Sequence, residues 1–267
     1  MRKRGEDGIA LIAVLWMLTL LSIIAAAIAI ESRSNTRIAQ NMTENATARE
    51  AADAGIQRVI LDLDPATRAA AKAPSFNADG TVYAWRFADC MVYITLRDEA
   101  SKIDLNKASE VLLAALFTSV GVDRTKAQSL ADAVADFRDT DNLRRPLGAE
   151  ASDYRDAGLS WGPKNAPFQT VEELEQVLGM TPEIYRRVMH DVSVYSVTAV
   201  LPTAADARLA KSLGRAGFEL PPVATSPREV FSIRAEARSA NGGMFVREAI
   251  VQKGQWILSW KQGAPTT

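Results

Sequence analysis

The sequence has almost none of the two side chains that most often carry catalysis and metal binding. Among its 267 residues there is one cysteine, Cys90, and one histidine, His190. A single chain therefore cannot build a disulfide framework or a cysteine-based zinc site, and helical zinc-protease motifs need two histidines. A serine hydrolase triad would have to use His190. An exported enzyme is thus the least expected class, and we expect no catalytic residue.

The chain also lacks an excess of either charge. It has 31 basic and 32 acidic residues, a formal net charge of -1, and 48% hydrophobic side chains. No overall field would attract nucleic acid or acidic lipid, so such a partner would need a local basic patch. The length and the apolar content allow one sizeable or two small domains with real cores.

Charged side chains are missing again from residues 9–30. As a helix this run would span about 33 Å, which matches the hydrocarbon core of a bilayer at about 30 Å. Arg2, Lys3 and Arg4 precede the run, and no comparable basic cluster follows it at once. This asymmetry predicts a single membrane span with a cytoplasmic N-terminus and an exported C-terminal domain.

A cleaved signal peptide is the competing interpretation of this segment. Residues 27–29, Ala-Ile-Ala, are a small-x-small pattern, and cleavage there would start the mature chain at Ile30. However, the apolar run is longer than the roughly 7 to 15 residues of a signal peptide, and residues 6–8, Glu-Asp-Gly, separate it from the basic residues. Apolar residues also continue at steps of three and four to Leu63, which predicts one long helix, half apolar and half amphipathic.

Strand signals lie on both sides of a helical block. Alternation in steps of two predicts two strands within residues 82–96, joined by a turn near Ala88 and Asp89, with Cys90 as a small core or strand-end residue. The same alternation predicts further strands towards the end of the chain: residues 192–200, 230–239, 244–252 and 255–260. A short helical piece is expected between the first two of them. The fold class is therefore α+β with a helical excursion.

The helical block runs from Ile103 to His190. Its spacing predicts a helix on either side of Gly121, a helix with a capping box formed by Thr170 and Glu173, and a last helix that begins at Thr181 and Pro182.

The helix pair within residues 101–141 resembles a SAM-like helix-hairpin-helix unit, in which a glycine-bearing turn offers backbone N–H groups to a nucleic-acid phosphate. Asp123, however, stands where the phosphate would approach. We favour Gly121 as the helix stop and Asp123 as the next helix cap, and we expect no nucleic acid. An exported DNA-binding protein of a competence-type system stays the alternative function.

Acidic side chains gather just after this helix pair. Asp139, Asp141 and Glu150 stand at the first, third and twelfth positions of a loop, a spacing similar to that of calcium loops. The match is partial, because the fifth position is Leu143 and the sixth is Arg144 in place of glycine. The loop is therefore not an EF-hand.

Clustered carboxylates repel one another unless a cation or basic side chains neutralise them. The candidate metal ligands are four carboxylates and two weaker oxygen donors: Asp136, Asp139, Asp141 and Glu150, then Asp153 and Asn165. The competing neutralisers are three nearby arginines: Arg138, Arg144 and Arg145. The spacing alone leaves calcium and an ion-pair network as equal alternatives. A catalytic carboxylate pair is less expected, because nothing nearby predicts a substrate-binding frame.

The basic leader, Gly8 and the apolar helix together resemble a type IV pilin or pseudopilin precursor. The resemblance implies that a prepilin peptidase removes a leader peptide, residues 1–8, and that the new terminus, Ile9, is N-methylated. Most pilins carry glutamate at the fifth mature position, where this chain has Ala13. That departure is the pattern expected of the minor pseudopilin K.

Motifs along almost the whole chain resemble the same family, the minor pseudopilin K family of the type II secretion pathway. They are "IDLNKAS", "ADFRDTD", "GAEASDY", "NAPFQTVEELEQVLGM", "FSIRAEARS" and "VREAIVQ". The resemblance implies a pilin-like long helix packed on a small antiparallel sheet, a large all-helical insertion, and bound calcium. It also implies a place at the tip of a periplasmic pseudopilus, with minor pseudopilins I and J and an inner-membrane assembly platform as partners.

The expected domain organisation follows from these elements. After the leader come the transmembrane half of the helix, the first part of a pilin-like domain, the helical insertion, and the second part of the pilin-like domain: residues 9–30, 31–100, 101–191 and 192–267.

Overall fold

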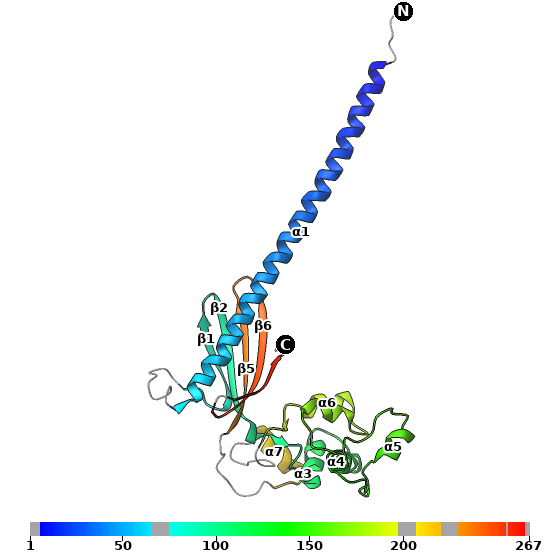
Figure 1. The fold of residues 1–267 in the computed structure, drawn as a ribbon, viewed down its shortest axis with the longest axis vertical. Coiled ribbons are helices and arrows are strands. Elements are labelled where there is room, and N and C mark those ends of the chain that lie inside the picture. The colour runs from blue at the N-terminus through cyan, green and yellow to red at the C-terminus, as the bar shows by residue number, and fades with distance from the viewer. Residues whose placement is uncertain (1–5, 66–74, 197–206, 220–228, 255, 265–267) are drawn as a thin grey trace, which may run out of the picture.

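The structure is a computed structural model that describes residues 6–65, 75–196, 207–219, 229–254 and 256–264. It shows one long helix, a sheet against its C-terminal half, and a group of short helices beyond the end of the sheet (Figure 1). In chain order the elements are α1 (Glu6–Leu63), β1 (Asp79–Phe87), β2 (Cys90–Asp98), η1 (Glu99–Ser101), β3 (Ile103–Asp104), α3 (Glu110–Ser119), α4 (Arg124–Arg138), α5 (Ala151–Asp156), η2 (Val171–Gln176), α6 (Pro182–Val188), β4 (Val192–Ser193), α7 (Ala207–Arg215), β5 (Val230–Ser239), β6 (Met244–Gln252) and β7 (Trp256–Gln262).

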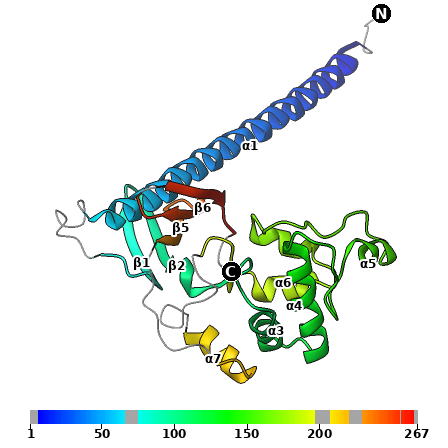
Figure 2. The same cartoon turned by 60° about the horizontal axis from the view of Figure 1, so that its bottom comes forward.

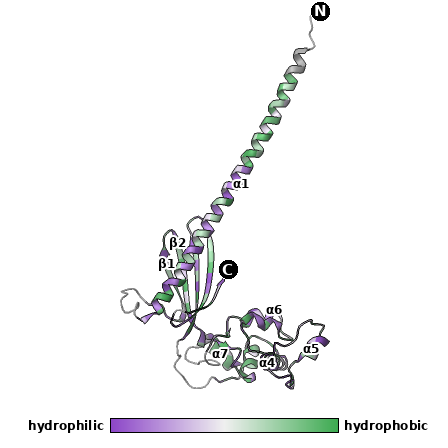
Figure 3. Ribbon diagram, viewed as in Figure 1, coloured by the Kyte–Doolittle hydropathy of each residue, from purple (hydrophilic) through white to green (hydrophobic). Residues whose placement is uncertain are grey.

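Helix α1 is continuous from Glu6 to Leu63, as the sequence predicted, and Pro65 follows its end. Its 58 residues correspond to about 87 Å at 1.5 Å per residue. The N-terminal half projects away from the rest of the chain and is largely hydrophobic (Figure 3). Its large apolar side chains are exposed, as Trp16 is at 74%. Among the described residues, α1 is the one helix long and apolar enough to cross a membrane.

The C-terminal half of α1 packs on one face of an antiparallel sheet with the strand order β1-β2-β5-β6-β7. Helix and sheet approach closely at Gly55, where a Cβ atom would lie 2.9 Å from Val92 Cγ1 and 3.1 Å from Ala235 Cβ. Alternate residues of β2 are buried, which is the pattern of a strand with one face on a core. We call residues 44–65 and these five strands the sheet unit.

The short helices enclose a second core, separate from that of the sheet unit. Its largest buried side chains include Phe117, Phe137 and Tyr154. We call residues 103–196 and 207–219 the helical unit. Asp98, at the end of β2, pairs with Phe231 in β5, so the chain leaves and re-enters the sheet at the same end. The helical unit is therefore an insertion beyond that end of the sheet (Figure 2).

Most predicted elements are present, including the turn between β1 and β2, the buried Cys90, and α3 and α4 on either side of Gly121. The predicted helix at Thr170 is instead the 3-10 helix η2, and the Thr170 side chain makes no capping hydrogen bond. The capping box fails because Glu173 is engaged elsewhere: its Oε2 accepts from Lys164 Nζ at 2.7 Å and from the Gln169 N–H at 3.2 Å.

The predicted strand at residues 192–200 also differs. Its described part forms only the two-residue β4, and residues 197–200 lie outside the described part of the chain. Strand β4 pairs in parallel with β3, and buried Val192 belongs to the core of the helical unit. Leu209 and Leu213 of α7 are buried in the same core. The helical unit thus extends past residue 191, because these apolar side chains pack against it and not against the sheet.

Candidate metal site

The candidate site lies in the loop between α4 and α5, and both ends of the loop are fixed by helix ends. Asp139 is the C-cap of α4, with its N–H bonded to the Ala135 carbonyl at 3.2 Å. Glu150 is the N-cap of α5. Buried Tyr154 anchors α5, and its hydroxyl accepts from the Leu178 N–H at 2.9 Å. The two ends of the loop are therefore held in place by the core of the helical unit.

Three of the predicted ligands come together in this loop. One carboxylate oxygen from each of Asp139, Asp141 and Glu150 lies within 4.8 Å of the others. Oxygens bound at about 2.3 to 2.6 Å to one calcium ion lie at most about 5 Å apart, so the three can share a single ion. Glu150 is buried, Asp139 is half-buried and Asp141 is exposed, so the site opens to solvent on one side.

Several oxygens at this place are buried without a hydrogen-bond partner. They are Asp139 Oδ1, both carboxylate oxygens of Glu150, and Asn165 Oδ1. A buried polar atom left unpaired costs about 1 to 3 kcal/mol, and more when it is charged. Four such oxygens at one loop are candidate ligands for a hard cation, which takes oxygen ligands.

Asn165 is brought to the loop from a distant part of the sequence. Its N–H donates to the Phe137 carbonyl at 3.0 Å, and its Nδ2 donates to Asn142 Oδ1 at 2.9 Å. The backbone is left-handed there, with φ of 51°, a conformation that asparagine tolerates better than most residues. Asn165 thus lies beside the ligand loop with its side-chain amide turned so that Nδ2 is bonded and Oδ1 is unpaired. The sequence pattern predicted Asn165 only as a weaker oxygen donor, and it did not identify Asn142, which orients the Asn165 side chain.

Burial and neighbouring negative charges favour the protonated form of the Glu150 carboxyl. Its pKa is raised above its usual value, first by burial and then by the charges of Asp136, Asp139 and Asp141. Three carboxylates thus disfavour the ionised form of a fourth, and a cation bound among them would remove that repulsion.

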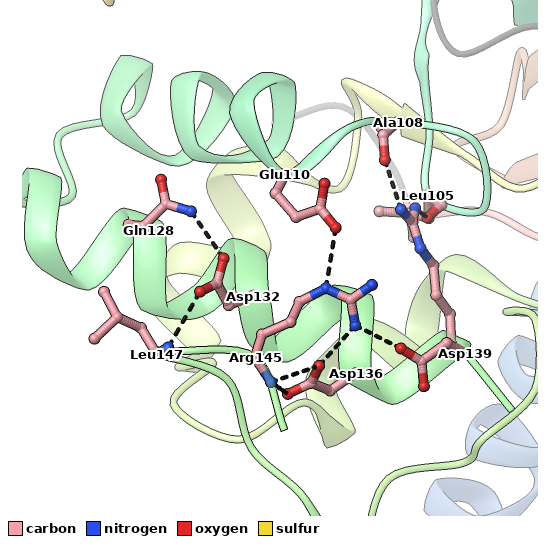
Figure 4. Close-up of polar contacts among 10 residues, drawn as sticks. Leu105, Ala108, Glu110, Gln128, Asp132, Asp136, Asp139, Arg145 and Leu147 are labelled. Atoms are coloured by element: carbon pink, nitrogen blue, oxygen red, sulfur yellow. Dashed lines mark hydrogen bonds and ion pairs between the residues drawn. The ribbon is translucent and has the colours of Figure 1, made fainter. Parts of the chain in front are cut away.

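Arginines neutralise part of this acidic group, as the competing interpretation predicted. Arg145 Nη1 lies 2.7 Å from Asp136 Oδ1 and 2.5 Å from Asp139 Oδ2, and its Nε lies 3.0 Å from Glu110 Oε1 (Figure 4). Arg144 Nη1 lies 2.8 Å from Asp153 Oδ1. The ion pairs and the unpaired oxygens therefore coexist, on different atoms of the same cluster.

Arg138, the third predicted neutraliser, has another role. Its guanidinium donates to the backbone carbonyls of Leu105 and Ala108 and so ties the end of α4 to the chain before α3. Burial lowers its pKa below the usual value.

Two other predicted ligands lie at the edge of the group with partners of their own. Asp136 is fully buried and accepts from Arg145 through both the guanidinium and the backbone N–H. It also fills the space beside Gly148, where a Cβ atom would lie 2.0 Å from Asp136 Oδ2. Asp153 Oδ2 accepts from the Glu150 N–H at 2.8 Å and so helps to begin α5. Both residues shape the loop from outside the group of three carboxylates.

The helix pair itself shows the geometry of a stop and a cap. Gly121 has φ of 92°, and Asp123 Oδ1 accepts from the Thr125 N–H at 2.9 Å at the start of α4. A carboxylate thus covers the helix N-terminus that a phosphate would need, which does not favour nucleic-acid binding. The residues of the predicted processing site, Gly8 and Ile9, lie in the first turns of α1.

Comparison with known proteins connects this fold to protein secretion. The family model described as type II secretion system (T2SS), protein K, matches residues 94–197. An Escherichia coli (strain K12) protein named for protein K of the type II secretion system is 26% identical over 208 residues, which are 72% of this chain and 64% of that protein. This chain therefore covers less than two thirds of the length of that relative.

The fold has a counterpart among solved structures. A chain in the crystal structure of the GspK-GspI-GspJ complex from the enterotoxigenic Escherichia coli type 2 secretion system matches 88% of this chain and 100% of its own length. The TM-score is 0.54 and the sequence identity is 15%, a likeness that shows the fold. In sequence, this chain is thus similar to protein K of the type II secretion system over residues 94–197 and over the 208 residues matched to the relative, and it shares the fold of the solved chain.

Proposed function

We propose that the protein is the minor pseudopilin at the tip of a type II secretion pseudopilus, where it supports the start of assembly and secretion across the outer membrane. The observation that carries this proposal is the position of the helical unit. It lies at the end of the molecule opposite the exposed apolar half of α1 (Figure 1). A subunit stacked above in a fibre would meet this bulk, whereas a terminal subunit has free space there.

Assembly in this proposal depends on α1. Its exposed apolar half needs a bilayer or the helices of other subunits to cover it. The N-terminus would face the cytoplasm and the sheet and helical units the periplasm, in agreement with the basic residues before the helix. The partners would be minor pseudopilins I and J, in line with the name of the matched GspK-GspI-GspJ complex, together with a prepilin peptidase and the inner-membrane assembly platform.

Processing gives the test of this proposal. Cleavage between Gly8 and Ile9 would leave a mature chain with a methylated Ile9 and Ala13 at its fifth position. Intact mass spectrometry of the protein from membranes should find that terminus. A chain that begins at Ile30 would contradict the proposal, because the apolar half of α1 would then be lost with a signal peptide.

The role is structural and needs no catalytic residue, but it includes a metal. Calcium would be held by Asp139, Asp141 and Glu150 with the side-chain oxygen of Asn165. The donor set is made of oxygens only, which suits a hard cation and does not suit zinc or copper. Bound calcium would balance the carboxylate charge and fix the loop between α4 and α5.

Calcium titration of the full chain in detergent tests this part. Asp141→Asn should weaken binding and remove the calcium-induced rise in melting temperature. Asp156→Asn is the matched control, since it removes the same charge from an exposed residue of α5 outside the group of three carboxylates. Equal binding by both variants would contradict the metal site.

A further inference from the structure

We call the loop between α4 and α5, residues 139–150, the metal loop. Arg145 connects this loop to α3 and α4. Its guanidinium reaches Asp136 on α4, Asp139 at the end of α4, and Glu110 in the first turn of α3 (Figure 4). These contacts raise its pKa above the usual value, with the bond to Asp139 as the largest cause and that to Asp136 as the second. One side chain thus fixes three carboxylates from two helices.

The contact with Asp139 is selective for one of its two oxygens. Asp139 Oδ2 is 2.5 Å from Arg145 Nη1, whereas Asp139 Oδ1 is buried without a partner. A free carboxylate can rotate and offer both oxygens to a metal ion. With Oδ2 bonded to Arg145, Oδ1 is the oxygen of Asp139 that has no partner and could bind a metal.

Arg145 is itself held rigidly enough to do this. Its backbone N–H donates to Asp136 Oδ2 at 3.2 Å, and its Nη1 donates to Asp136 Oδ1 at 2.7 Å. Asp136 is fully buried, and Gly148 leaves it the space that a side chain at that position would fill. The planar guanidinium presents its donors in a fixed geometry, which an ammonium group cannot reproduce.

From these contacts we infer that Arg145 is a positioning residue of the metal site: it orders Asp139 for single-oxygen coordination and links the ion to the α3–α4 pair. The inference rests on the proposed calcium site. It deepens that proposal by naming a residue that acts on the metal through a ligand and does not touch the metal itself.

Charge and geometry predict opposite effects of removing Arg145. As a nearby cation it repels calcium, so loss of its charge alone would tighten binding. As a positioning residue it prepares a ligand, and loss of such a partner weakens metal affinity by about 10- to 100-fold. The sign of the change therefore distinguishes the two roles.

The experiment is isothermal titration of calcium into the full chain in detergent for the wild type, Arg145→Gln, Arg145→Lys, Glu110→Gln and Arg155→Gln. Both Arg145 variants should bind calcium at least about tenfold more weakly, because neither side chain can make the three contacts. Glu110→Gln should bind only slightly more weakly, since it leaves the contacts to Asp136 and Asp139 in place. Arg155→Gln removes the same charge from exposed α5 and should bind like the wild type.

A second readout separates positioning from a general loss of stability. Europium luminescence lifetimes in light and heavy water count the water molecules on the bound ion, and this number should change when Arg145 no longer holds Asp139. Unchanged or tighter binding by Arg145→Gln, wild-type affinity of Arg145→Lys, or an unchanged water number would overturn the inference. A wild-type chain that binds no calcium would instead contradict the metal site itself.

Discussion

The sheet unit and the helical unit differ in whether their buried polar side chains have partners. In the sheet unit, buried charges have partners: Arg247 pairs with Asp53 on α1, and Glu236 lies between Arg234 and Arg238. In the part of the chain that the structure describes, all the buried side-chain oxygens without a partner belong to the helical unit. The buried charges of the sheet unit are therefore paired within the unit, whereas the helical unit leaves oxygens without hydrogen-bond partners, most of them at the proposed calcium site.

The difference follows from how each unit is built. A long helix on a sheet buries small and β-branched side chains in one core, among them Ala52, Ile94 and Ala235. The helical unit joins short helices by loops, so caps such as Asp139 and Glu150 meet at helix ends inside the structure. The oxygens of such caps therefore lie close together, as one carboxylate oxygen from each of Asp139, Asp141 and Glu150 does.

The largest expected effect comes from core deletions that compare the two units. Phe137→Ala should cost about 4 kcal/mol of stability, and Ile56→Ala about 3 kcal/mol, because both side chains are fully buried. Phe137 stacks on Phe168, with ring centroids 4.9 Å apart, and its carbonyl accepts the Asn165 N–H. Phe137→Ala should therefore also weaken calcium binding, whereas Ile56→Ala should not.

Hydrogen exchange measured by mass spectrometry with and without calcium checks this pair of variants. In the Phe137→Ala protein the helical unit should lose protection, and calcium should restore part of it. In the Ile56→Ala protein the loss should be confined to the sheet unit and α1, whatever the calcium concentration. Calcium-dependent protection of β5 in either variant would show that the two units are not independent.

A smaller effect is expected from the ion pair between α1 and the sheet. Arg247 Nε and Nη2 lie 2.5 and 3.2 Å from the two carboxylate oxygens of Asp53, and Arg247 is only 6% exposed. Asp53→Asn should cost about 2 kcal/mol, since it leaves a buried guanidinium without its charge partner. The loss is limited because Arg247 also stacks on Phe245 and Trp260.

Urea unfolding measures this loss of folding free energy, and hydrogen exchange shows whether the loss lies in β6. Asp62→Asn is less suitable as a control because Asp62 Oδ2 accepts the Phe76 N–H, so exposed Glu50→Gln on the same helix is preferable. Calcium affinity should be the same in the wild type, Asp53→Asn and Glu50→Gln. A calcium effect in Asp53→Asn would mean that the sheet unit contributes to the metal site.

Sequence patterns predicted the elements whose signals are local. The apolar run of α1, the turn at Ala88 and the cap at Asp123 each depend on a few neighbouring residues, and each is present. The 3-10 helix η2 was missed because Glu173 bonds Lys164 and not the cap. Helix α5 was missed as well, although Asp153, which accepts the Glu150 N–H at 2.8 Å, stands three residues after the helix cap and is a local signal for a helix start.

The site was predictable only as a set of candidates. Spacing identified Asp139, Asp141 and Glu150. It could not show that Arg145 binds one oxygen of Asp139 and leaves the other without a partner, because that contact depends on tertiary packing. Asn165 reaches the loop through bonds to Phe137 and Asn142, more than twenty residues earlier in the chain, and no periodicity reports such a contact.

The smallest expected effect concerns Asp104 in β3, whose buried Oδ2 makes no hydrogen bond among the described residues and lies 3.9 Å from Lys107 Nζ. Burial raises its pKa, although the Asn106 N–H at 2.8 Å on Oδ1 and the charge of Lys107 act to lower it. The folded chain therefore keeps a proton that the unfolded chain releases, and this group's contribution to stability falls as pH rises from the ordinary aspartate pKa through the raised one.

Asp104→Asn removes that penalty while its side-chain oxygen can still accept the Asn106 N–H. At pH 7 the variant should be more stable than the wild type by about 1 kcal/mol, and the gap should be smaller at pH 4, because the raised pKa lets the wild-type carboxyl take up a proton as the pH falls. Urea unfolding at the two pH values, with calcium held constant, measures both. A less stable variant at pH 7 would show that Lys107 compensates the Asp104 charge. In that case the buried oxygens that destabilise the helical unit would all lie in or beside the metal loop, and the proposed calcium ion alone would be needed to neutralise them.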